Sequence, residues 1–330
     1  MLKTGIISTA KIAQTQVIPA GLNAQGVEIC GIASRDLALA RRVAGHFGIP
    51  ECYGSYDAML ASDSIDCVYI PLPTSHHVEW AVRAADAGKH VLVEKPLALN
   101  AGDIQAVIDA RDRNGVMITE AFMVHYHPQW AHVRDVIQSG KIGRLRHVQG
   151  AFTYFNRDPG NMRNQPDLGG GALPDIGVYP SVTTRVATGQ EPLSVSANIE
   201  FDAVFETDIY ASVQARFDGF SLDFYVSTTM ALHQSMRFHG EEGYIELTAP
   251  FNAGGYDTAR VRTCNQNRSV VDEKVFVGVD QYQLQFEALA RAVAEGDGSS
   301  LFSLEDSVRN QRLLDAAYAS AKQGAPVAMG

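Results

Sequence analysis

Hydrophobic positions recur along the first third of the chain in two alternating kinds of segment. Short runs rich in β-branched residues, such as KTGIIS, VEICGIAS, DCVYIPL and KHVLVEK, alternate with Ala-rich segments such as DLALARRVAGHFG. Continuous apolar strands separated by amphipathic helices are typical of a parallel sheet with helices on both faces. The pattern therefore predicts an α/β fold, with a doubly wound parallel-sheet domain over residues 1–121.

The pattern changes in the rest of the chain. Between residues 144 and 280 many strands and few helices are predicted, as in LSVSANIEFD, DIYASVQARF and FSLDFYVST. Strands that follow one another so closely pair antiparallel. Residues 122–330 are therefore predicted to form a second domain of the α+β class with a large, mostly antiparallel, open sheet. One helix begins near Gly171 and two helices end the chain, and these last helices either stay in the second domain or pack back on the first.

The composition fits this two-domain picture and narrows the range of partners. The chain has 330 residues, of which 46% are hydrophobic and 19% charged, and its net charge is -10. A negative protein repels phosphate backbones and anionic lipids, so we expect neither nucleic-acid nor membrane partners. No apolar stretch approaches the ~20 residues of a membrane-spanning helix, and the N-terminus enters a strand rather than a signal peptide. We therefore expect a cytoplasmic protein.

The segment GIISTAKIA, residues 5–13, lies where a nucleotide-binding loop is expected, directly after the first strand. Ser8, Ala10 and Ala13 occupy the spaced positions of the G-x-G-x-x-G/A pattern, so the loop has small side chains without the usual glycines. The start of a helix binds pyrophosphate through its free N–H groups and its dipole. On these residues alone, a dinucleotide loop and a tight turn of some other doubly wound protein remain equally good interpretations.

Three longer motifs favour the dinucleotide loop. They are YIPLPTSHHVEWA (residues 69–81), AGKHVLVEKPLALN (residues 87–100) and GGGALPDIGVYP (residues 169–180). Together they resemble the Gfo/Idh/MocA oxidoreductases, and EAFMVHYHPQW and SLEDSVRNQRLLDAAYASAKQG also look like segments of that family. The resemblance implies an N-terminal nicotinamide-binding Rossmann domain, a C-terminal domain with a large antiparallel sheet, and a Ser-Thr-Ala loop in place of the two glycines.

The resemblance also assigns residues to the cofactor. The implied cofactor-binding residues are Ser8, Thr9, Ala10, Ile12, Ser34, Arg35, Leu72, Pro73, His77, Glu94, Lys95, Arg163 and Tyr282. Pro73 and His77 are implied to lie beside the nicotinamide and its ribose, and Glu94 and Lys95 to meet the nicotinamide end.

The end of the second predicted strand favours NADP over NAD. Ser34 and Arg35 follow this strand, and a hydroxyl and a guanidinium can hold the 2'-phosphate of NADP through charge-assisted hydrogen bonds. NAD binding instead relies on a carboxylate at this place. The Ser-Arg pair also resembles NADP-using members of the family, while Asp36, one residue further on, keeps NAD open as the alternative.

Hydride transfer from a carbinol carbon requires a base for the hydroxyl proton. Asp175 and Tyr179 are four residues apart on a predicted helix, which places both side chains on one face. An ammonium group near a phenol favours the phenolate and lowers the pKa of the phenol. We therefore predict that Tyr179 is the base, that Lys95 tunes it and donates to the substrate oxygen, and that Asp175 orients the substrate or Lys95. The Tyr form resembles dimeric dihydrodiol dehydrogenase, NADP-linked xylose dehydrogenases and glucose-fructose oxidoreductase.

The histidines do not change this prediction. His76, His77, His125 and His127 lie close together in two segments, but no third ligand follows with the spacing of a metal site. We predict that no metal is bound.

The predicted function is therefore that of an NADP-dependent oxidoreductase that transfers a hydride between nicotinamide and a carbinol or carbonyl carbon of a sugar, a polyol or a related cyclic diol. An NAD-dependent glycosidase of the same family and a catalytically silent dinucleotide or sugar sensor are the alternatives. We also expect a homodimer or homotetramer joined through the open face of the large sheet. That face is predicted to carry the apolar residues that alternate along strands such as DIYASVQARF.

Overall fold

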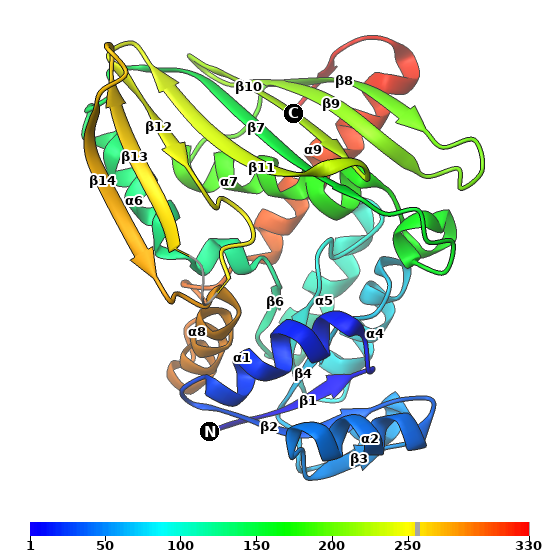
Figure 1. Ribbon diagram of the computed structural model, residues 1–330. Helices are drawn as coiled ribbons and strands as arrows, with labels where there is room; N and C mark the ends of the chain where they lie inside the picture. Colours follow the sequence, from blue (N-terminus) through cyan, green and yellow to red (C-terminus); the bar gives the residue numbers. More distant parts are fainter. Residues whose placement is uncertain (255–257, 330) are drawn as a thin grey trace. The chain divides into compact units, whose positions relative to one another are not determined.

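The structure, a computed structural model, describes residues 1–254 and 258–329 (Figure 1). It consists of two compact units, of which the first comprises Met1–Met123 and Tyr282–Val308. The second unit comprises Val124–Gln281 and the chain from Arg309 onward. Within the described ranges, no helix has both the length and the apolar character needed to cross a membrane.

A six-stranded parallel sheet forms the centre of unit 1. Its strands are β1 (Leu2–Ile7), β2 (Val27–Ala33), β3 (Glu51–Tyr53), β4 (Cys67–Ile70), β5 (His90–Val93) and β6 (Ile118–Glu120). They are ordered β3-β2-β1-β4-β5-β6, and every neighbouring pair is parallel. This is the doubly wound order of dinucleotide-binding domains, in which ligands bind beyond the carboxyl ends of the strands, where the order reverses between β1 and β4. The predicted parallel sheet is confirmed.

Helices cover both faces of this sheet. They are α1 (Ile18–Asn23), α2 (Leu37–Phe47), α3 (Tyr56–Leu60), α4 (His77–Asp86), α5 (Ile104–Asn114) and α8 (Gln281–Glu295). Small residues of α4 and α5 pack with strand residues such as Val68 and Val91 in one continuous buried cluster. Elsewhere on the sheet, the ring of Phe286 from α8 packs 6.3 Å from the ring of Tyr69. Both faces are therefore dry, which is why the strands are apolar throughout.

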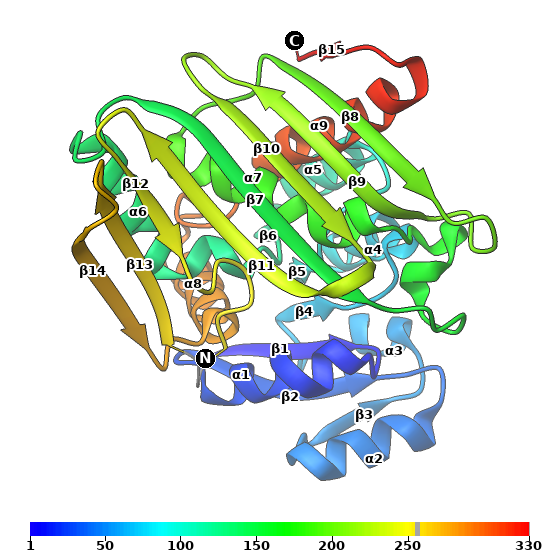
Figure 2. The same ribbon diagram turned by 45° about the horizontal axis from the view of Figure 1, so that its top comes forward.

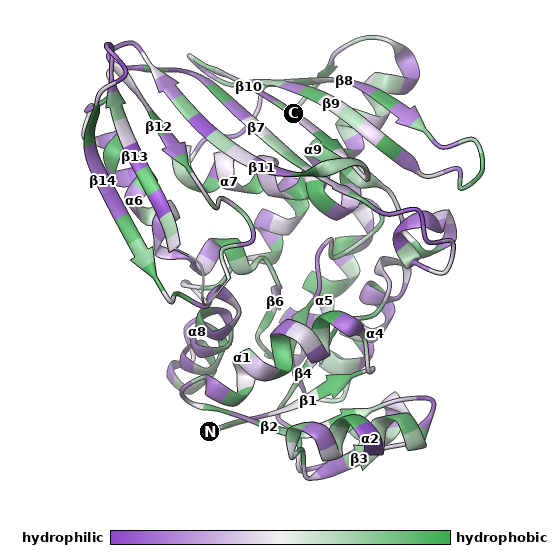
Figure 3. Ribbon diagram, viewed as in Figure 1, coloured by the Kyte–Doolittle hydropathy of each residue, from purple (hydrophilic) through white to green (hydrophobic). Residues whose placement is uncertain are grey.

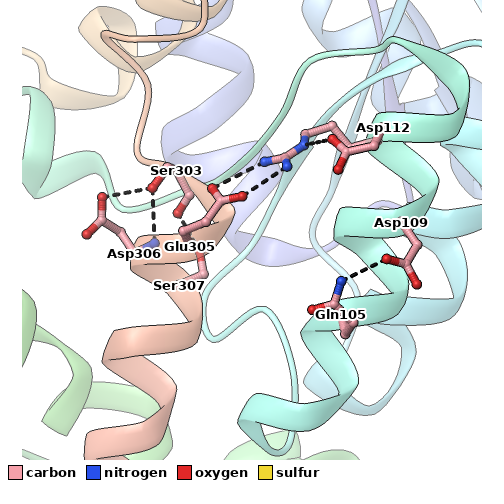
Figure 4. A network of polar contacts seen from close by, with 8 residues as sticks. Gln105, Asp109, Asp112, Ser303, Glu305, Asp306 and Ser307 are labelled. Atoms are coloured by element: carbon pink, nitrogen blue, oxygen red, sulfur yellow. Dashed lines mark hydrogen bonds and ion pairs between the residues drawn. The ribbon is translucent and has the colours of Figure 1, made fainter. Parts of the chain in front are cut away.

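The first turn of α9 (Leu304–Gln323) is fastened to α5 by a polar network, shown in Figure 4. Ser303 caps the helix, because its Oγ accepts from the N–H of Asp306 at 3.0 Å and donates to the carboxylate of the same residue at 2.9 Å. Arg111 of α5 donates to both carboxylate oxygens of Glu305 and to Asp112. The helix that ends the chain thus begins in unit 1.

Unit 2 is built on a nine-stranded sheet ordered β14-β13-β12-β11-β7-β10-β9-β8-β15. The strands are β7 (Leu145–Phe155), β8 (Ser194–Phe201), β9 (Asp208–Arg216), β10 (Ser221–Ser227), β11 (Thr229–Gly240), β12 (Gly243–Leu247), β13 (Thr258–Asn265), β14 (Val270–Val277) and β15 (Val327–Ala328). Only β7 and β10 pair in parallel among these described strands. The prediction of a mostly antiparallel sheet is confirmed. Helices α6 (Pro128–Gln138) and α7 (Val178–Thr188) lie against one face (Figures 1 and 2).

The open face of this sheet differs from the prediction. In β9 the apolar residues Ala211, Val213 and Ala215 are buried, and they share a face with Phe224 and Gly150, whose own neighbour is Pro180 of α7. The apolar residues of these central strands therefore pack against the helices. Hydrophobic and hydrophilic residues alternate along several strands, as the colours in Figure 3 show. The prediction of an apolar open face was wrong, because a strand with period two has only one apolar side and the helices already cover it.

Charged pairs cover this outward side instead. Arg237 of β11 pairs with Glu246 of β12, and Arg262 of β13 donates to Glu273 of β14 at 2.6 Å. Next to the centre of the sheet, His147 lies 3.1 Å from Asp223. Exposed Val275 and Val277 lie on the same side of β14 as Glu273, so the open face carries both signs of charge together with some apolar surface.

Candidate functional site

The loop after β1 takes the backbone form that glycine usually provides. Ser8 has φ of 91°, which L residues other than glycine rarely adopt, and its Oγ accepts from the N–H of Ala10 at 3.3 Å. The side-chain amide of Gln14 donates to the carbonyl of Thr9 at 2.7 Å. The following helix starts with a π-helical turn over Ala13–Val17. A turn with small side chains, held by hydrogen bonds to its own backbone, thus leads into the start of a helix, as phosphate binding requires.

The residues at the end of β2 show which of Arg35 and Asp36 can bind the adenine ribose side of a dinucleotide. Asp36 is the N-cap of α2, and its carboxylate accepts from the N–H groups of Ala38 at 2.9 Å and Leu39 at 3.1 Å. Ser34 accepts from the N–H of Asp36 at 3.1 Å. Arg35 is exposed and hydrogen-bonds to the hydroxyl of Tyr56. The carboxylate therefore works as a helix cap, and the guanidinium is the charged group that this loop presents.

His77 joins the two loops that follow β4 and β5. Its Nδ1 lies 2.8 Å from the carbonyl oxygen of Pro96, and its Nε2 lies 2.7 Å from that of Leu72. The ring is buried, and burial lowers the pKa of His77 to about 4, although both carbonyl oxygens act in the opposite direction. His77 therefore holds the backbone on either side of the segment predicted to flank the nicotinamide.

Two carboxyl groups hold the Glu-Lys-Pro segment after β5. The hydroxyl of Tyr69 donates to Glu94 at 2.6 Å, and the N–H of Lys95 donates to the same carboxylate at 3.2 Å. Glu120, at the end of β6, accepts from the N–H of Leu97 at 2.8 Å. Burial raises the pKa of Glu120 to about 7, against the lowering effect of its hydrogen bonds to Leu97 and Ser307. The sequence contained no local signal that assigned Glu120 to this segment.

In unit 2 the Gly-rich motif leads into a π-helical turn, Leu173–Gly177, and then into α7. Asp175 lies in that turn. Its Oδ2 accepts from the hydroxyl of Tyr154 at 2.6 Å and from Nε of Arg163 at 2.7 Å. Asp175 raises the pKa of Arg163, and burial together with the Asp175 charge raises the pKa of Tyr154. Both partners therefore keep their protons and donate to this carboxylate at neutral pH.

Tyr179 follows on α7 and is 5% exposed. Its ring packs beside those of Phe152 and Phe251, with a centroid distance of 5.6 Å to each, and those two rings stack on each other at 5.3 Å. Arg163 interacts electrostatically with Tyr179 as well as with Asp175, so the two predicted catalytic side chains of unit 2 share one neighbour. Tyr154, which the sequence analysis did not name, completes this cluster.

The remaining predicted site residues lie in two short segments. Pro73 directly precedes the single 3-10 turn Thr74–His76, and Tyr282 lies in the first turn of α8. Among the residues that the structure describes, no three His, Cys, Asp or Glu side chains are grouped closely enough to hold a metal ion.

Comparison with known proteins assigns both units to described families. Residues 2–122 match the model of an oxidoreductase family with an NAD-binding Rossmann fold. Residues 130–246 match the model of the GFO/IDH/MocA C-terminal domain.

Individual relatives extend over nearly the whole chain. The uncharacterized oxidoreductase ORF334 of Rhizobium meliloti is 42% identical over 98% of each chain. A D-xylose 1-dehydrogenase (NADP(+)) of Haloferax volcanii is 36% identical, again over 98% of each chain. The crystal structure of a 3-ketoreductase from Actinomadura kijaniata in complex with NADP and TDP-benzene superimposes with a TM-score of 0.90, 30% identity and 97% coverage of both chains.

Proposed function

The chain belongs to the Gfo/Idh/MocA oxidoreductases, and from this we propose that it is an NADP-dependent dehydrogenase or reductase of a sugar, a polyol or a related cyclic diol. The observation that carries the choice of cofactor is the end of β2. There the carboxylate of Asp36 caps α2, and the exposed guanidinium of Arg35 can pair with a 2'-phosphate. The NADP-linked xylose dehydrogenase among the relatives supports an aldose as the first substrate class to test.

The residues of unit 1 fit a dinucleotide. The turn at Ser8 has the positive φ that a close backbone approach needs, and no side chain larger than threonine occurs between Ser8 and Ala10. We assign the pyrophosphate to the loop Ser8–Ala10 with Ile12 and the 2'-phosphate to Ser34 and Arg35.

The nicotinamide end completes the cofactor assignment. It goes to Leu72, Pro73, Glu94 and Lys95, with His77 holding their backbone and with Arg163 and Tyr282 as further contacts. Bound NADP supplies the acceptor for the hydride.

We propose Lys95, Asp175 and Tyr179 as the catalytic residues. In the oxidative direction the substrate C–H bond breaks with its electron pair leaving as hydride, and the hydroxyl proton passes to the phenolate of Tyr179. The products are a carbonyl compound, reduced nicotinamide and a proton on Tyr179, which is then released to solvent. The Lys95 ammonium favours the phenolate and donates to the substrate oxygen, and the side chain of Asp175 orients the substrate hydroxyls.

We further propose that the protein is a homodimer or homotetramer joined through the outward face of the large sheet. This face carries both signs of charge, so opposite charges of two copies can pair across a two-fold contact.

A panel of aldoses and polyols, each incubated with NADP or NAD, tests the proposed reaction through the absorbance of reduced nicotinamide. We expect turnover with at least one aldose and a higher kcat/KM with NADP.

Arg35→Ala should weaken NADP binding by about 10- to 100-fold, because a charge-assisted hydrogen bond is worth about 1.5 to 3 kcal/mol, and should leave NAD binding nearly unchanged. Equal binding of the two cofactors by the native protein would contradict the assignment of Arg35. Hydrolysis of a chromogenic glycoside without net reduction would indicate the glycosidase instead.

A further inference from the structure

Asp208, the first residue of β9, has its carboxylate directed at the start of the segment that leads into α7. The residue is buried, with 2% of its surface exposed. Its Oδ2 accepts from the N–H of Leu173 at 2.6 Å, and it also accepts from the N–H of Ala172. Its Oδ1 accepts from the hydroxyl of Tyr318, in α9, at 2.7 Å. Three donors from two elements therefore converge on one buried carboxylate.

Gly171 shows how closely this carboxylate approaches the backbone. A Cβ at this position would lie 2.0 Å from Oδ1 of Asp208, and the φ of Gly171 is +136°, which side chains other than hydrogen rarely allow. The third glycine of the Gly-Gly-Gly motif is thus required by a carboxylate that enters from a strand 37 residues later. The motif and Asp208 form one structural unit.

We propose that Asp208 is a positioning residue, which fixes the first turn before α7 so that the side chains of Asp175 and Tyr179 are held in their reactive places. This inference rests on the proposed function, because those two residues are the ones it positions. Asp175 lies two residues after Leu173, and its carboxylate accepts hydrogen bonds from the side chains of Tyr154 and Arg163. A shift of the turn would move Asp175 out of that hydrogen-bonded cluster, and displacement of about 1 Å is enough to slow a reaction substantially.

The surroundings of Asp208 make its effect dependent on pH. The titratable groups that face it are the phenols of Tyr318 and Tyr154, and Asp315 lies one turn before Tyr318 on α9. Burial raises the pKa of Asp208 to about 6, while its hydrogen bonds to Tyr318, Leu173 and Ala172 act in the opposite direction. As the pH falls through about 6, the carboxyl gains a proton and loses an acceptor site, so the turn is held less firmly.

The test measures kcat and KM against pH for the native protein, Asp208→Asn and Tyr318→Phe. In the native protein we expect kcat to fall below about pH 6. Asp208→Asn should lower kcat by roughly 10- to 100-fold, remove this acid limb and leave the KM for NADP unchanged. Tyr318→Phe removes one donor to the carboxylate, so its acid limb should move to higher pH. A positional effect without titration would not produce that shift.

Asp202→Asn is the matched control, because Asp202 lies at the other end of the same β8–β9 connection and accepts from the backbone N–H groups of Val204 and Phe205. Its acid limb and kcat should stay as in the native protein. Amide hydrogen exchange at Ala172 and Leu173, compared at equal pH, gives a readout that does not need activity, and both amides should exchange faster in Asp208→Asn. Unchanged exchange in Asp208→Asn, or an unshifted acid limb in Tyr318→Phe, would overturn the inference. Absence of oxidoreductase turnover in the native protein, with exchange altered as expected, would instead overturn the proposed function alone.

Discussion

Glu120 and Asp208 are buried carboxyl groups that lower the free energy of unfolding at neutral pH. A carboxyl group whose pKa is raised in the folded chain binds its proton more tightly there than in the unfolded chain. Its contribution to stability is therefore greatest below its ordinary pKa and is lost as the pH rises through the folded value. Each of them accepts backbone N–H groups next to a residue with a proposed catalytic role. Stability alone does not account for them, whereas positioning of the Lys95 and Asp175 segments does.

Glu120→Gln should therefore stabilise the protein, and only at neutral or alkaline pH. Glutamine keeps an oxygen that can accept from Leu97 but has no charge to bury. The pKa of Glu120 rises from its ordinary 4.5 to about 7. The free energy of unfolding of the native protein should therefore fall, relative to that of the variant, as the pH rises from 4.5 to about 7. The expected gain at pH 8 reaches about 3 kcal/mol, as an upper value. Urea denaturation at a series of pH values measures it.

Glu79→Gln, in which an exposed carboxylate of α4 is replaced, is the control and should show no such dependence. His77 acts with the opposite sign, because its lowered pKa adds stability as the pH rises from about 4 to 6.5, but it is present in all three proteins and cancels from the differences. An equal effect of Glu120→Gln at pH 5 and pH 8 would show that the carboxyl does not titrate in this range.

Tyr179→Phe tests the proposed base. The ring would keep its packing against Phe152 and Phe251, so folding and NADP binding should survive while kcat falls by roughly 10²- to 10⁴-fold. Lys95→Ala should lower kcat at least as far. The double variant should cost much less than the two single effects combined, because residues that act as one unit are not additive. Turnover close to native in Tyr179→Phe would assign the base to Lys95 or, next, to His77.

The sequence was enough to propose Lys95, Asp175 and Tyr179 because each stands in a contiguous motif. It could not identify Tyr154, Glu120 or Asp208, since these residues reach their partners through the sheet. Tyr154 meets Asp175 across 21 positions, and Asp208 meets Tyr318 across 110. No local period records such encounters. They depend on strand order and register, and these are settled by packing along the whole chain.

At the level of elements, the two helices that the proposed site uses share a backbone irregularity that hydrophobic periodicity does not reveal. The helix after the β1 loop contains a π-helical turn, Ala13–Val17, and α7 follows another, Leu173–Gly177. A helix is expected from the sequence after each of these two loops, but the π-helical turns are not, because one widened turn changes the hydrophobic period too briefly to alter the pattern. The first turn follows the strained Ser8 and the second follows Gly171. Both helices that the proposed site uses thus have irregular backbone near their starts.

Gly171→Ala tests how tightly the second of these starts is built. The added methyl group would meet the Asp208 carboxylate at 2.0 Å, and alanine also disfavours φ of +136°. We expect a loss of about 3 kcal/mol or more in the free energy of unfolding, measured by denaturant titration. In an Asp208→Ala background the same substitution should cost less, because the contact with the carboxylate is gone, while the backbone strain and the contact with Pro174 at 3.1 Å remain.

Gly45→Ala provides a matched control within a helix. Gly45 lies in α2, and nothing lies within 4 Å of the place that its Cβ would take. Alanine there should stabilise the protein by about 0.5 to 1 kcal/mol through helix propensity alone. If Gly171→Ala behaved like Gly45→Ala, the contact between the glycine and the carboxylate would be too loose to position the turn.

At the scale of the whole molecule, the alternation of strands and helices was sufficient to predict the two sheets, because parallel and antiparallel sheets impose different hydrophobic patterns. It could not show that residues 282–308 belong to the same unit as the first 123, because helices with one apolar face pack equally well on either sheet. The open face of the large sheet was misread for a related reason. Period two shows that one side is apolar but not which side the helices cover.

The polar character of that face makes the proposed assembly testable by charge reversal. Arg237→Glu would place a second carboxylate beside that of Glu246, and it would remove the guanidinium that lies over the ring of Tyr244. If two copies pack through this face, the repulsion is repeated in each copy and partly desolvated, so the dissociation constant should rise about tenfold or more. Analytical ultracentrifugation over a range of protein concentrations measures the change.

Arg83→Glu is a close control, because Arg83 also pairs with a carboxylate, that of Asp57, and lies over an aromatic ring, that of Trp80, but belongs to unit 1. Both variants change the net charge from -10 to -12, so a general effect of charge would act on them equally. We expect the native protein and Arg83→Glu to remain dimeric or tetrameric at concentrations where Arg237→Glu dissociates. A native protein that stays monomeric at every concentration would contradict the assembly itself, whereas equal dissociation of the two variants would contradict only its location on the sheet.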